Sequence, residues 1–409
     1  MKSDVDLNHS NHARRARGWR EWTLRVLLVS FSTVLCAGAL EVGARITVWN
    51  WSRQPNVVRE PFARFDPDLG WSKPPNARGI LRRPEYQTSL EVNSLGLRGP
   101  EVSIEKPPGV RRILLLGDSF TEGYTVEESD TVRSLLERAM NTTPRAPVQV
   151  INGGTAGWST DQEVLFYKLR GRQFSPDLVI LLFYYNDLYR DGDLRIQPWF
   201  EIDEAGALVL RNHPVPPHRE FYRGSPFALK PYRGSMALAL LQPRLSSHPR
   251  VAGVLARFGL TDPPTPRLVP DEFHPFGRQR PKEVRAHWAR LSELLKRLAG
   301  EVAQDGASLA VFYVPARFEI DDGAWALTRS LYGLNAHWDR NRVAEALGSV
   351  AQDLGLPFSD PRPAFRSREA AGVATYFPQD GHWTEAGNQV ATAELLRMIS
   401  RHRLLESQD

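Results

Sequence analysis

Two segments of this chain carry residue types that suit acyl-transfer chemistry. Ser119 follows the uninterrupted apolar run Ile113–Leu116, Gly117 and Asp118. His382 lies two residues after Asp380, just before a segment with helical periodicity. A serine hydroxyl becomes a nucleophile when a nearby base takes its proton, and histidine often serves as that base. On the first segment alone, a turn serine that caps a helix is an equally good interpretation of Ser119.

Candidate donors for a developing oxyanion follow two further apolar runs. Val148–Ile151 is followed by the glycine-rich loop 152–157, and Leu178–Tyr184 is followed by Tyr185 and Asn186. The carboxyl ends of parallel strands meet at one edge of a sheet, where ligands bind. A glycine can bring a backbone N–H close to a substrate, and an asparagine amide supplies another donor. These turns would therefore lie beside Ser119.

The elements that must position these residues alternate between strand and helix. Apolar runs predict strands at Ile113–Leu116, Val148–Ile151, Leu178–Tyr184, Leu309–Val314 and Leu356–Phe358. Helical spacing predicts helices at Val132–Met140, Asp161–Leu169, 282–303 and 341–354, and a last helix that Thr384 caps and that ends near Arg401. This alternation predicts an α/β fold, a three-layer α/β/α sandwich around a mainly parallel sheet. The positive end of the last helix would disfavour imidazolium and keep His382 a neutral base.

The N-terminal 49 residues have the pattern of a membrane anchor. Residues 1–21 are polar and rich in arginine, and residues 22–49 are mostly apolar with tryptophans near both ends. We expect an uncleaved, single-pass signal anchor, with residues 1–21 in the cytoplasm and the rest outside the cytoplasmic membrane. A signal peptide cleaved after Ala37-Gly38-Ala39 is the alternative, because the uncharged run Val26–Leu40 is short for a span. The single cysteine, Cys36, lies in this run as a small apolar residue, and its lipidation is a weaker alternative.

The remaining chain divides into a lead-in and one large domain. Residues 50–109 predict an extracytoplasmic lead-in of short strands or irregular structure, and residues 110–404 the domain. Residues 188–281 form a proline-rich insertion in which only Ser235–Leu241 is periodic. The insertion is either a long irregular segment or a lid or substrate-docking surface near the site.

Composition excludes several classes of function. The net charge is +5, from 52 Lys and Arg against 47 Asp and Glu, without a long basic block beyond the N-terminus. Nucleic acid is therefore not an expected partner. One cysteine excludes an internal disulfide or a cysteine-rich zinc site. The metal-protease, P-loop and dinucleotide-binding motifs are missing from the sequence, so we expect no metal and no cofactor.

Taken together, the motifs resemble those of the SGNH (GDSL-type) hydrolases. Gly117-Asp118-Ser119, Gly157, Asn186 and the pair Asp380 and His382 occur in that family's order. The resemblance implies that Ser119 is the nucleophile, His382 the base and Asp380 the residue that orients it. It also implies an oxyanion hole made by the N–H groups of Ser119 and Gly157 and the side chain of Asn186.

The resemblance covers about residues 110–190 and 280–400 and departs from the family pattern at one place. The usual last motif is Asp-x-x-His, whereas Asp380 to Trp383 read Asp-x-His-Trp. The shorter form is similar to that of relatives that O-acetylate bacterial exopolysaccharides. Asp271 and His274 have the usual spacing, but they lie in the insertion before the final strands, so we interpret them as a decoy. Within loop 152–157, Gly153 and Gly154 remain alternatives to Gly157 as the oxyanion donor.

The sequence therefore predicts a membrane-anchored periplasmic serine acyl-ester hydrolase of the esterase or deacetylase type. Its substrate would be an acylated glycan or a small ester, cleaved through an acyl-enzyme. One alternative is an O-acyltransferase for an envelope or exported glycan, with a membrane-bound partner supplying the acyl donor. Another is a catalytically inactive glycan-binding module.

Overall fold

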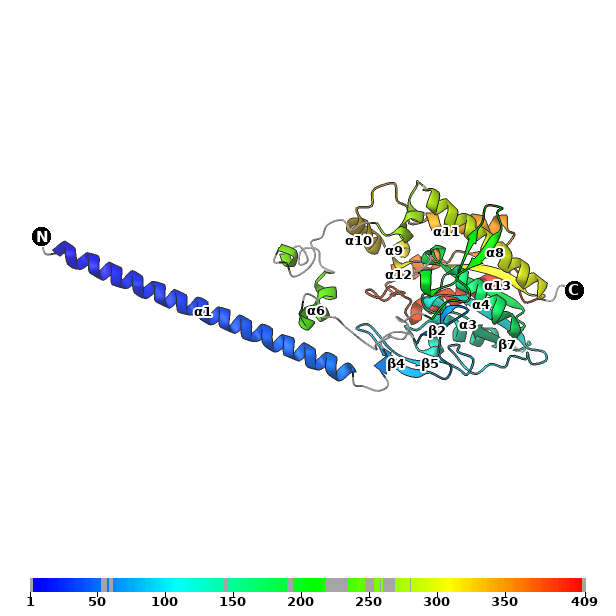
Figure 1. Cartoon of the computed structure of the whole chain (residues 1–409), viewed down its shortest axis with the longest axis horizontal. Helices are drawn as coiled ribbons and strands as arrows, with labels where there is room; N and C mark the ends of the chain where they lie inside the picture. Colours follow the sequence, from blue (N-terminus) through cyan, green and yellow to red (C-terminus); the bar gives the residue numbers. More distant parts are fainter. Residues whose placement is uncertain are drawn as a thin grey trace. The chain divides into compact units, whose positions relative to one another are not determined.

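The computed structural model describes most of the chain (Figure 1), and the chain divides into two units. The described residues are 3–52, 57–58, 62–142, 146–189, 194–217, 234–246, 254–257, 259, 269–279 and 281–406. One unit comprises residues 1–55 and 227–264, and the other comprises residues 56–226 and 265–409. The second unit contains every predicted site residue.

The second unit is built on a five-stranded sheet with all neighbours parallel, in the order β12-β11-β8-β6-β7. Its strands are β6 (Arg111–Gly117), β7 (Val148–Asn152), β8 (Leu178–Tyr184), β11 (Ser308–Val314) and β12 (Phe358–Ser359). The four long apolar runs are the strands that the sequence predicts. The fifth predicted strand, Leu356–Phe358, overlaps β12 only at Phe358, the residue at which β12 begins.

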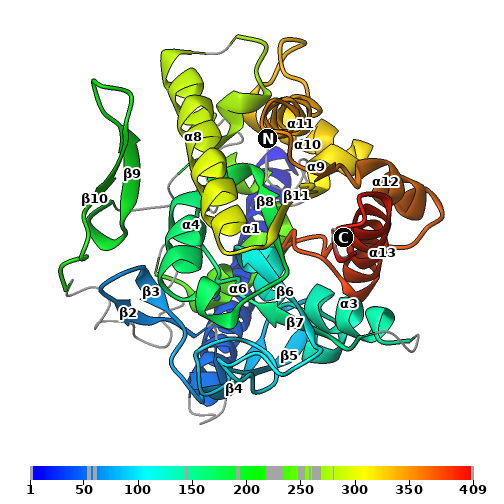
Figure 2. The ribbon, with the colours of Figure 1, turned by 90° about the vertical axis from the view of Figure 1, so that its right-hand side faces the viewer.

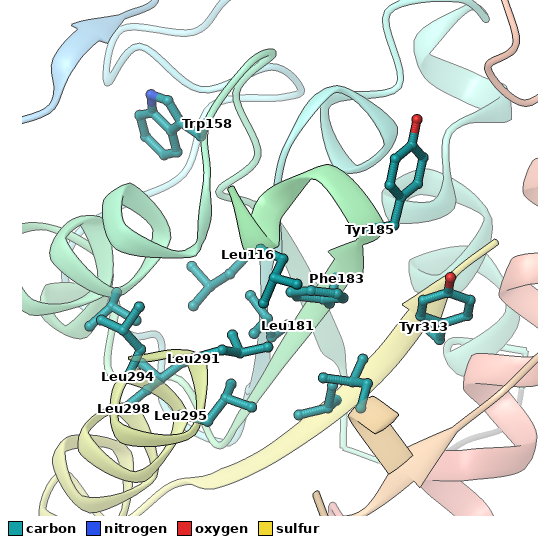
Figure 3. Close-up of a cluster of buried hydrophobic side chains, with 14 of the residues drawn as sticks. Leu116, Trp158, Leu181, Phe183, Tyr185, Leu291, Leu294, Leu295, Leu298 and Tyr313 are labelled. Atoms are coloured by element: carbon teal, nitrogen blue, oxygen red, sulfur yellow. The ribbon is translucent and has the colours of Figure 1, made fainter. Parts of the chain in front are cut away.

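Alternate residues of the strands face opposite sides of the sheet, and helices cover both faces (Figure 2). One core cluster joins Leu116, Leu181 and Phe183 to the leucines of α8, as Figure 3 shows. The other contains the intervening strand residues, such as Leu115 and Ile180. Because the central strand β8 is buried on both faces, its sequence is continuously apolar.

The layers are a sheet between two groups of helices, which confirms the predicted three-layer α/β/α sandwich. The first core cluster includes residues of α4 (Thr160–Leu169), α8 (Lys282–Gln304) and α11 (Arg342–Asp353). The second includes residues of α3 (Val132–Met140), α12 (Arg362–Ala370) and α13 (Glu385–Arg401). Thr384 caps α13 as predicted, because its side chain accepts the Gly387 N–H at 3.3 Å. The sequence prediction missed α12, α9 (Arg317–Ile320) and α10 (Asp322–Tyr332).

Short strands and turns complete this unit. The lead-in contains β1 (Val57–Val58), β2 (Arg64–Asp66), β3 (Gly70–Ser72), β4 (Arg78–Arg82) and β5 (Gln87–Glu91). The 3-10 helices are η1 (Glu128–Asp130), η2 (Gly171–Phe174), η3 (Tyr185–Leu188), η4 (Leu194–Ile196) and η5 (Asp271–Phe276). In the insertion, β9 (Trp199–Ile202) and β10 (Leu208–Arg211) form an antiparallel hairpin that the sequence prediction missed. Much of the rest of the predicted insertion lies outside the described residues.

The first unit contains the long N-terminal helix α1 (Ser3–Ser52) and α6 (Met236–Ser246). Within α1, Trp22–Trp49 is long and apolar enough to cross a membrane, with a mean hydropathy of 1.9. Glu41 lies in this stretch, accepts N–H groups of Met236 and Ala237 at 3.0 and 3.1 Å, and accepts the Ser235 hydroxyl at 2.8 Å. This carboxylate therefore holds the first turn of α6 against α1.

Candidate active site

Ser119 is placed by the sharp exit of the chain from β6. A Cβ atom on Gly117 would lie 2.1 Å from Thr121 Oγ1 and 2.9 Å from the Leu182 carbonyl oxygen, so only glycine fits there. The side chain of Asp118 accepts the Phe120 N–H at 2.9 Å and caps the short helix α2 (Ser119–Glu122). Ser119 is thus the first residue of a helix at the carboxyl edge of the sheet, and its N–H has no acceptor within that helix.

The structure brings Ser119, His382 and Asp380 into one hydrogen-bonded series. Ser119 Oγ lies 2.8 Å from His382 Nε2, and His382 Nδ1 lies 2.6 Å from Asp380 Oδ1. Gly381 separates the last two residues and has a φ of 83°, a left-handed conformation that favours glycine. The turn is closed by the Phe377 N–H, which donates to the His382 carbonyl oxygen at 2.9 Å. Hence the shorter Asp-x-His spacing still places the carboxylate beside the imidazole.

Asp380 is held as a carboxylate by its neighbours. Burial opposes its ionisation, but hydrogen bonds from His382 and Tyr86 outweigh burial and keep its pKa below the ordinary value. The Tyr86 hydroxyl donates to Asp380 Oδ2 at 2.9 Å, so the two carboxylate oxygens contact different partners. The site therefore keeps a fixed negative charge next to Nδ1 of the imidazole.

Trp383 anchors the short last motif, Asp380 to Trp383, in the core. Its side chain is buried, with its ring 5.0 Å from that of Phe120 and 5.4 Å from that of Phe365. Its carbonyl oxygen accepts the Thr125 hydroxyl at 2.9 Å. The His382 ring also packs on Phe120, at 4.6 Å. The tryptophan thus fixes the position of the preceding histidine from inside the core.

The glycines of the 152–157 loop have different hydrogen-bonding roles. The Gly153 N–H donates to the Leu115 carbonyl oxygen at 2.8 Å, and the Gly154 N–H donates to Asn152 Oδ1 at 3.0 Å. Gly157 has a left-handed φ of 77°, and its N–H has no acceptor within the described part of the chain. The two alternatives are thus engaged in the fold, and the Gly157 N–H is the one available for a ligand.

Side chains from neighbouring segments hold the same loop. Lys73 is buried, and its Nζ donates to the Gly154 carbonyl oxygen at 2.6 Å and to Thr155 Oγ1 at 2.7 Å. Glu122 accepts the Ala156 N–H at 2.7 Å and lies 3.7 Å from the same ammonium. The loop is therefore fixed from both sides before any substrate arrives.

Asn186 lies in η3, directly beyond the carboxyl end of β8. That strand is the neighbour of β6, with Leu182 opposite Gly117. The Asp187 carboxylate accepts the Tyr184 N–H at 2.7 Å and shapes the turn that carries Asn186. The turns after β6, β7 and β8 thus meet at one edge, as their order in the sheet requires.

Asp271 and His274, the pair interpreted from the sequence as a decoy, both lie in η5. In η5, His274 Nδ1 lies 3.8 Å from Asp271 Oδ1, and its ring lies 6.1 Å from that of Trp338. The imidazole within hydrogen-bonding distance of Ser119 is that of His382.

Two tyrosines near the imidazole were missed by sequence reasoning. Tyr86 contacts Asp380 as described, and the Tyr124 hydroxyl lies 3.4 Å from both ring nitrogens of His382. Neither tyrosine has a sequence signal, because each reaches the site only through tertiary packing. Among the residues that the structure describes, no group of three or more His, Cys, Asp or Glu could hold a metal ion.

Solved structures align with this chain at low sequence identity. A catalytic mutant of an acetylxylan esterase from Geobacillus stearothermophilus aligns with 12% identity and a TM-score of 0.38, over 73% of this chain and 96% of that one. A lipase/acylhydrolase from Enterococcus faecalis aligns with 14% identity and a TM-score of 0.36, over 73% of this chain and all of that one (100%). The search of curated proteins finds no match.

Residues 115–390 match the GDSL-like Lipase/Acylhydrolase family. This range contains the predicted nucleophile, oxyanion donors, base and orienting acid, and it begins after the lead-in. Because the match spans more than half of the sequence, the chain belongs to the GDSL-like lipase/acylhydrolase family.

Proposed function

We propose that this protein is a serine acyl-ester hydrolase that works through an acyl-enzyme. The observation that carries the proposal is the distance of 2.8 Å between Ser119 Oγ and His382 Nε2, with Asp380 on the other ring nitrogen. This is the arrangement in which an imidazole can take the hydroxyl proton as the oxygen attacks an ester carbonyl.

The reaction has two steps at one site. In the first, Ser119 Oγ bonds to the acyl carbon, its proton passes to His382, and the imidazolium returns a proton to the leaving alcohol. In the second, His382 takes a proton from water, the resulting hydroxide attacks the acyl carbon, and Ser119 regains its proton as the acid leaves. Asp380 holds the ring in the correct tautomer and stabilises the imidazolium in both steps.

The oxyanion of each tetrahedral intermediate would be stabilised by three donors. These are the N–H of Ser119, the N–H of Gly157 and the side-chain amide of Asn186. The support for Gly157 is that Gly153 and Gly154 already donate within the fold. Donors held in place before the reaction stabilise the developing charge without reorganisation.

The enzyme would act on an acylated glycan or small ester outside the cytoplasmic membrane. The apolar stretch Trp22–Trp49 follows an arginine-rich segment, and such segments stay in the cytoplasm. The chain after the span would then be periplasmic.

A fluorophosphonate probe on the full-length protein in detergent micelles tests this function. We expect rapid labelling that Ser119→Ala abolishes and that Ser129→Ala leaves unchanged. Ser129 is a matched control because its exposed hydroxyl lies 2.9 Å from Oδ2 of the adjacent Asp130, just as the Ser119 hydroxyl lies 3.3 Å from Oδ2 of the adjacent Asp118. Absence of labelling in the wild type would contradict catalysis and favour a glycan-binding module. Product analysis with an acyl donor, with and without an acceptor glycan, separates hydrolysis from transfer to sugar.

A further inference from the structure

We propose that Tyr86 is a positioning residue for Asp380, so that the lead-in completes the catalytic site. This inference rests on the proposed function, in which Asp380 orients the base. Tyr86 lies in the turn of the lead-in hairpin, which comprises β4, β5 and the connecting residues 83–86. The hairpin precedes residues 115–390, which match the family, so the family match does not assign it a role.

The first support is the way in which the Tyr86 hydroxyl is aimed. It donates to Asp380 Oδ2 at 2.9 Å, while Oδ1 faces His382. The Tyr86 side chain is buried with Leu81 and Leu90 of the same hairpin, and its ring lies 4.9 Å from that of Phe377. The hydroxyl is therefore held by a packed ring, which limits rotation of the carboxylate away from the imidazole.

The second support is that the same turn also holds the backbone of Asp380. One carboxylate oxygen of Glu85 accepts the Asp380 backbone N–H at 2.7 Å, and both of its carboxylate oxygens lie within 3.0 Å of the Gln379 backbone nitrogen. Two adjacent residues of the hairpin thus fix the main chain and the side chain of the orienting acid.

The third support comes from the strand that follows the turn. Thr88 Oγ1 donates to the Tyr124 carbonyl oxygen at 2.7 Å, and the Ser89 N–H donates to Glu127 Oε1 at 2.9 Å. The Tyr124 hydroxyl in turn contacts the His382 ring. The lead-in hairpin therefore braces both segments that lie against the imidazole.

Tyr86 remains a donor over the working pH range, because burial and the nearby Asp380 charge raise its pKa. Its hydrogen bond draws some negative charge to Oδ2, away from the oxygen that faces His382. Without it, the carboxylate would stabilise the imidazolium more strongly and would also be less well oriented. Loss of the hydroxyl should thus affect protonation of the base as well as the rate.

The experiment compares Tyr86→Phe with the wild type, both as full-length proteins in detergent micelles. We expect a kcat about tenfold to a hundredfold lower, because a hydrogen bond to a charged group is lost, with little change in KM. The acid limb of the kcat/KM profile should move to higher pH, and fluorophosphonate labelling should slow in parallel. Tyr167→Phe is the matched control, because the Tyr167 hydroxyl also donates to an aspartate, Asp305, at 2.8 Å.

Tyr167→Phe should show the wild-type kcat and acid limb. The inference is overturned if Tyr86→Phe matches that control in both measurements while the wild type still labels at Ser119. A wild type that does not label would instead refute the proposed function. If Tyr86→Phe does not fold, Glu85→Gln is measured by the same assays. A lower kcat with a displaced acid limb of the kcat/KM profile supports positioning of Asp380 by the hairpin turn. An unchanged kcat and an unchanged pH profile overturn the inference.

Discussion

At the scale of single residues, the short last motif works because of the conformation at Gly381. Its left-handed φ of 83° lets Asp380 and His382 turn toward each other across one intervening residue. The space around it is open, since a Cβ there would meet no atom within 4 Å. Conformation, and not crowding, is therefore what requires glycine at this position.

This reasoning predicts the effect of Gly381→Ala. We expect a loss of about 1–2 kcal/mol in the free energy of unfolding, because alanine resists the left-handed region. We also expect a large fall in kcat, because relaxation of the turn separates Asp380 from His382. Gly372→Ala is the matched control, since Gly372 has a φ of 79° and equally open surroundings. Similar kcat values for the two variants, at similar stability, would contradict the role given to the turn.

A second prediction concerns the charge of Asp380. In Asp380→Asn the shape of the side chain is kept, but an amide can hold the imidazole in the wrong tautomer. The corresponding change in the Ser-His-Asp triad of another serine hydrolase lowers kcat by about 10⁴, and we expect a loss of that order. Steady-state kinetics should show it in kcat, with KM little changed. A raised KM at unchanged kcat would show instead that Asp380 binds substrate.

At the scale of helices and strands, the sequence predicts best those elements whose residue pattern follows from burial alone. The long strands are mostly apolar because helices cover both faces of the sheet, and this pattern places Ser119 and Asn186 at the same edge. The β9–β10 hairpin was missed although Asp203 and Gly206, between its strands, are residues typical of a turn. Tyr86 and Lys73 could not be predicted, because their contacts join segments far apart in the chain.

The lead-in is also fixed to the domain by an ion pair, which predicts a pH effect. Asp66 is buried, and a carboxylate oxygen lies 2.8 Å from Arg170 Nη2. Burial opposes ionisation of Asp66, but Arg170 and local hydrogen bonds hold its pKa below the ordinary value of 3.8. The stabilisation is therefore present above pH 3.8 and is lost as the pH falls through the lower, folded-state pKa.

Asp66→Asn should consequently unfold more easily than the wild type at pH 7, by about 1–3 kcal/mol. The difference should shrink as the pH falls below 3.8, and denaturant titrations at several pH values would measure it. Asp203→Asn is the control, because the Asp203 carboxylate accepts the N–H groups of Ala205 and Ala207 in the exposed β9–β10 turn, where the loss should be smaller. A difference for Asp66→Asn that stays constant with pH would contradict the proposed ion-pair contribution.

At the scale of the whole molecule, the apolar stretch Trp22–Trp49 and the candidate catalytic residues belong to different units. The first unit carries Trp22–Trp49, in which Glu41 is the acidic side chain. A carboxylate in such a stretch is costly unless it has partners, and here it accepts three hydrogen bonds from the start of α6 and pairs with Arg45 at 2.6 Å. All the contacts that define the candidate site lie within the second unit.

This separation predicts different results for two truncations. A chain that starts at residue 56 should leave the membrane fraction and still react with the fluorophosphonate probe, because the described site contacts all lie beyond that point. A chain that starts at residue 100 also lacks Lys73, Glu85 and Tyr86, and should react much more slowly or not at all. Membrane fractionation with carbonate washing, followed by labelling, measures both properties.

The comparison of the two truncated chains separates anchoring from catalysis. Circular dichroism on each chain establishes whether the sheet has formed, so that slow labelling by a folded chain reports on the site. If the chain from residue 56 stayed in carbonate-washed membranes, another segment would have to bind the bilayer. If the folded chain from residue 100 labelled as fast as the longer one, residues 56–99 would be dispensable, and residues 100–409 would suffice to hold the imidazole beside Ser119.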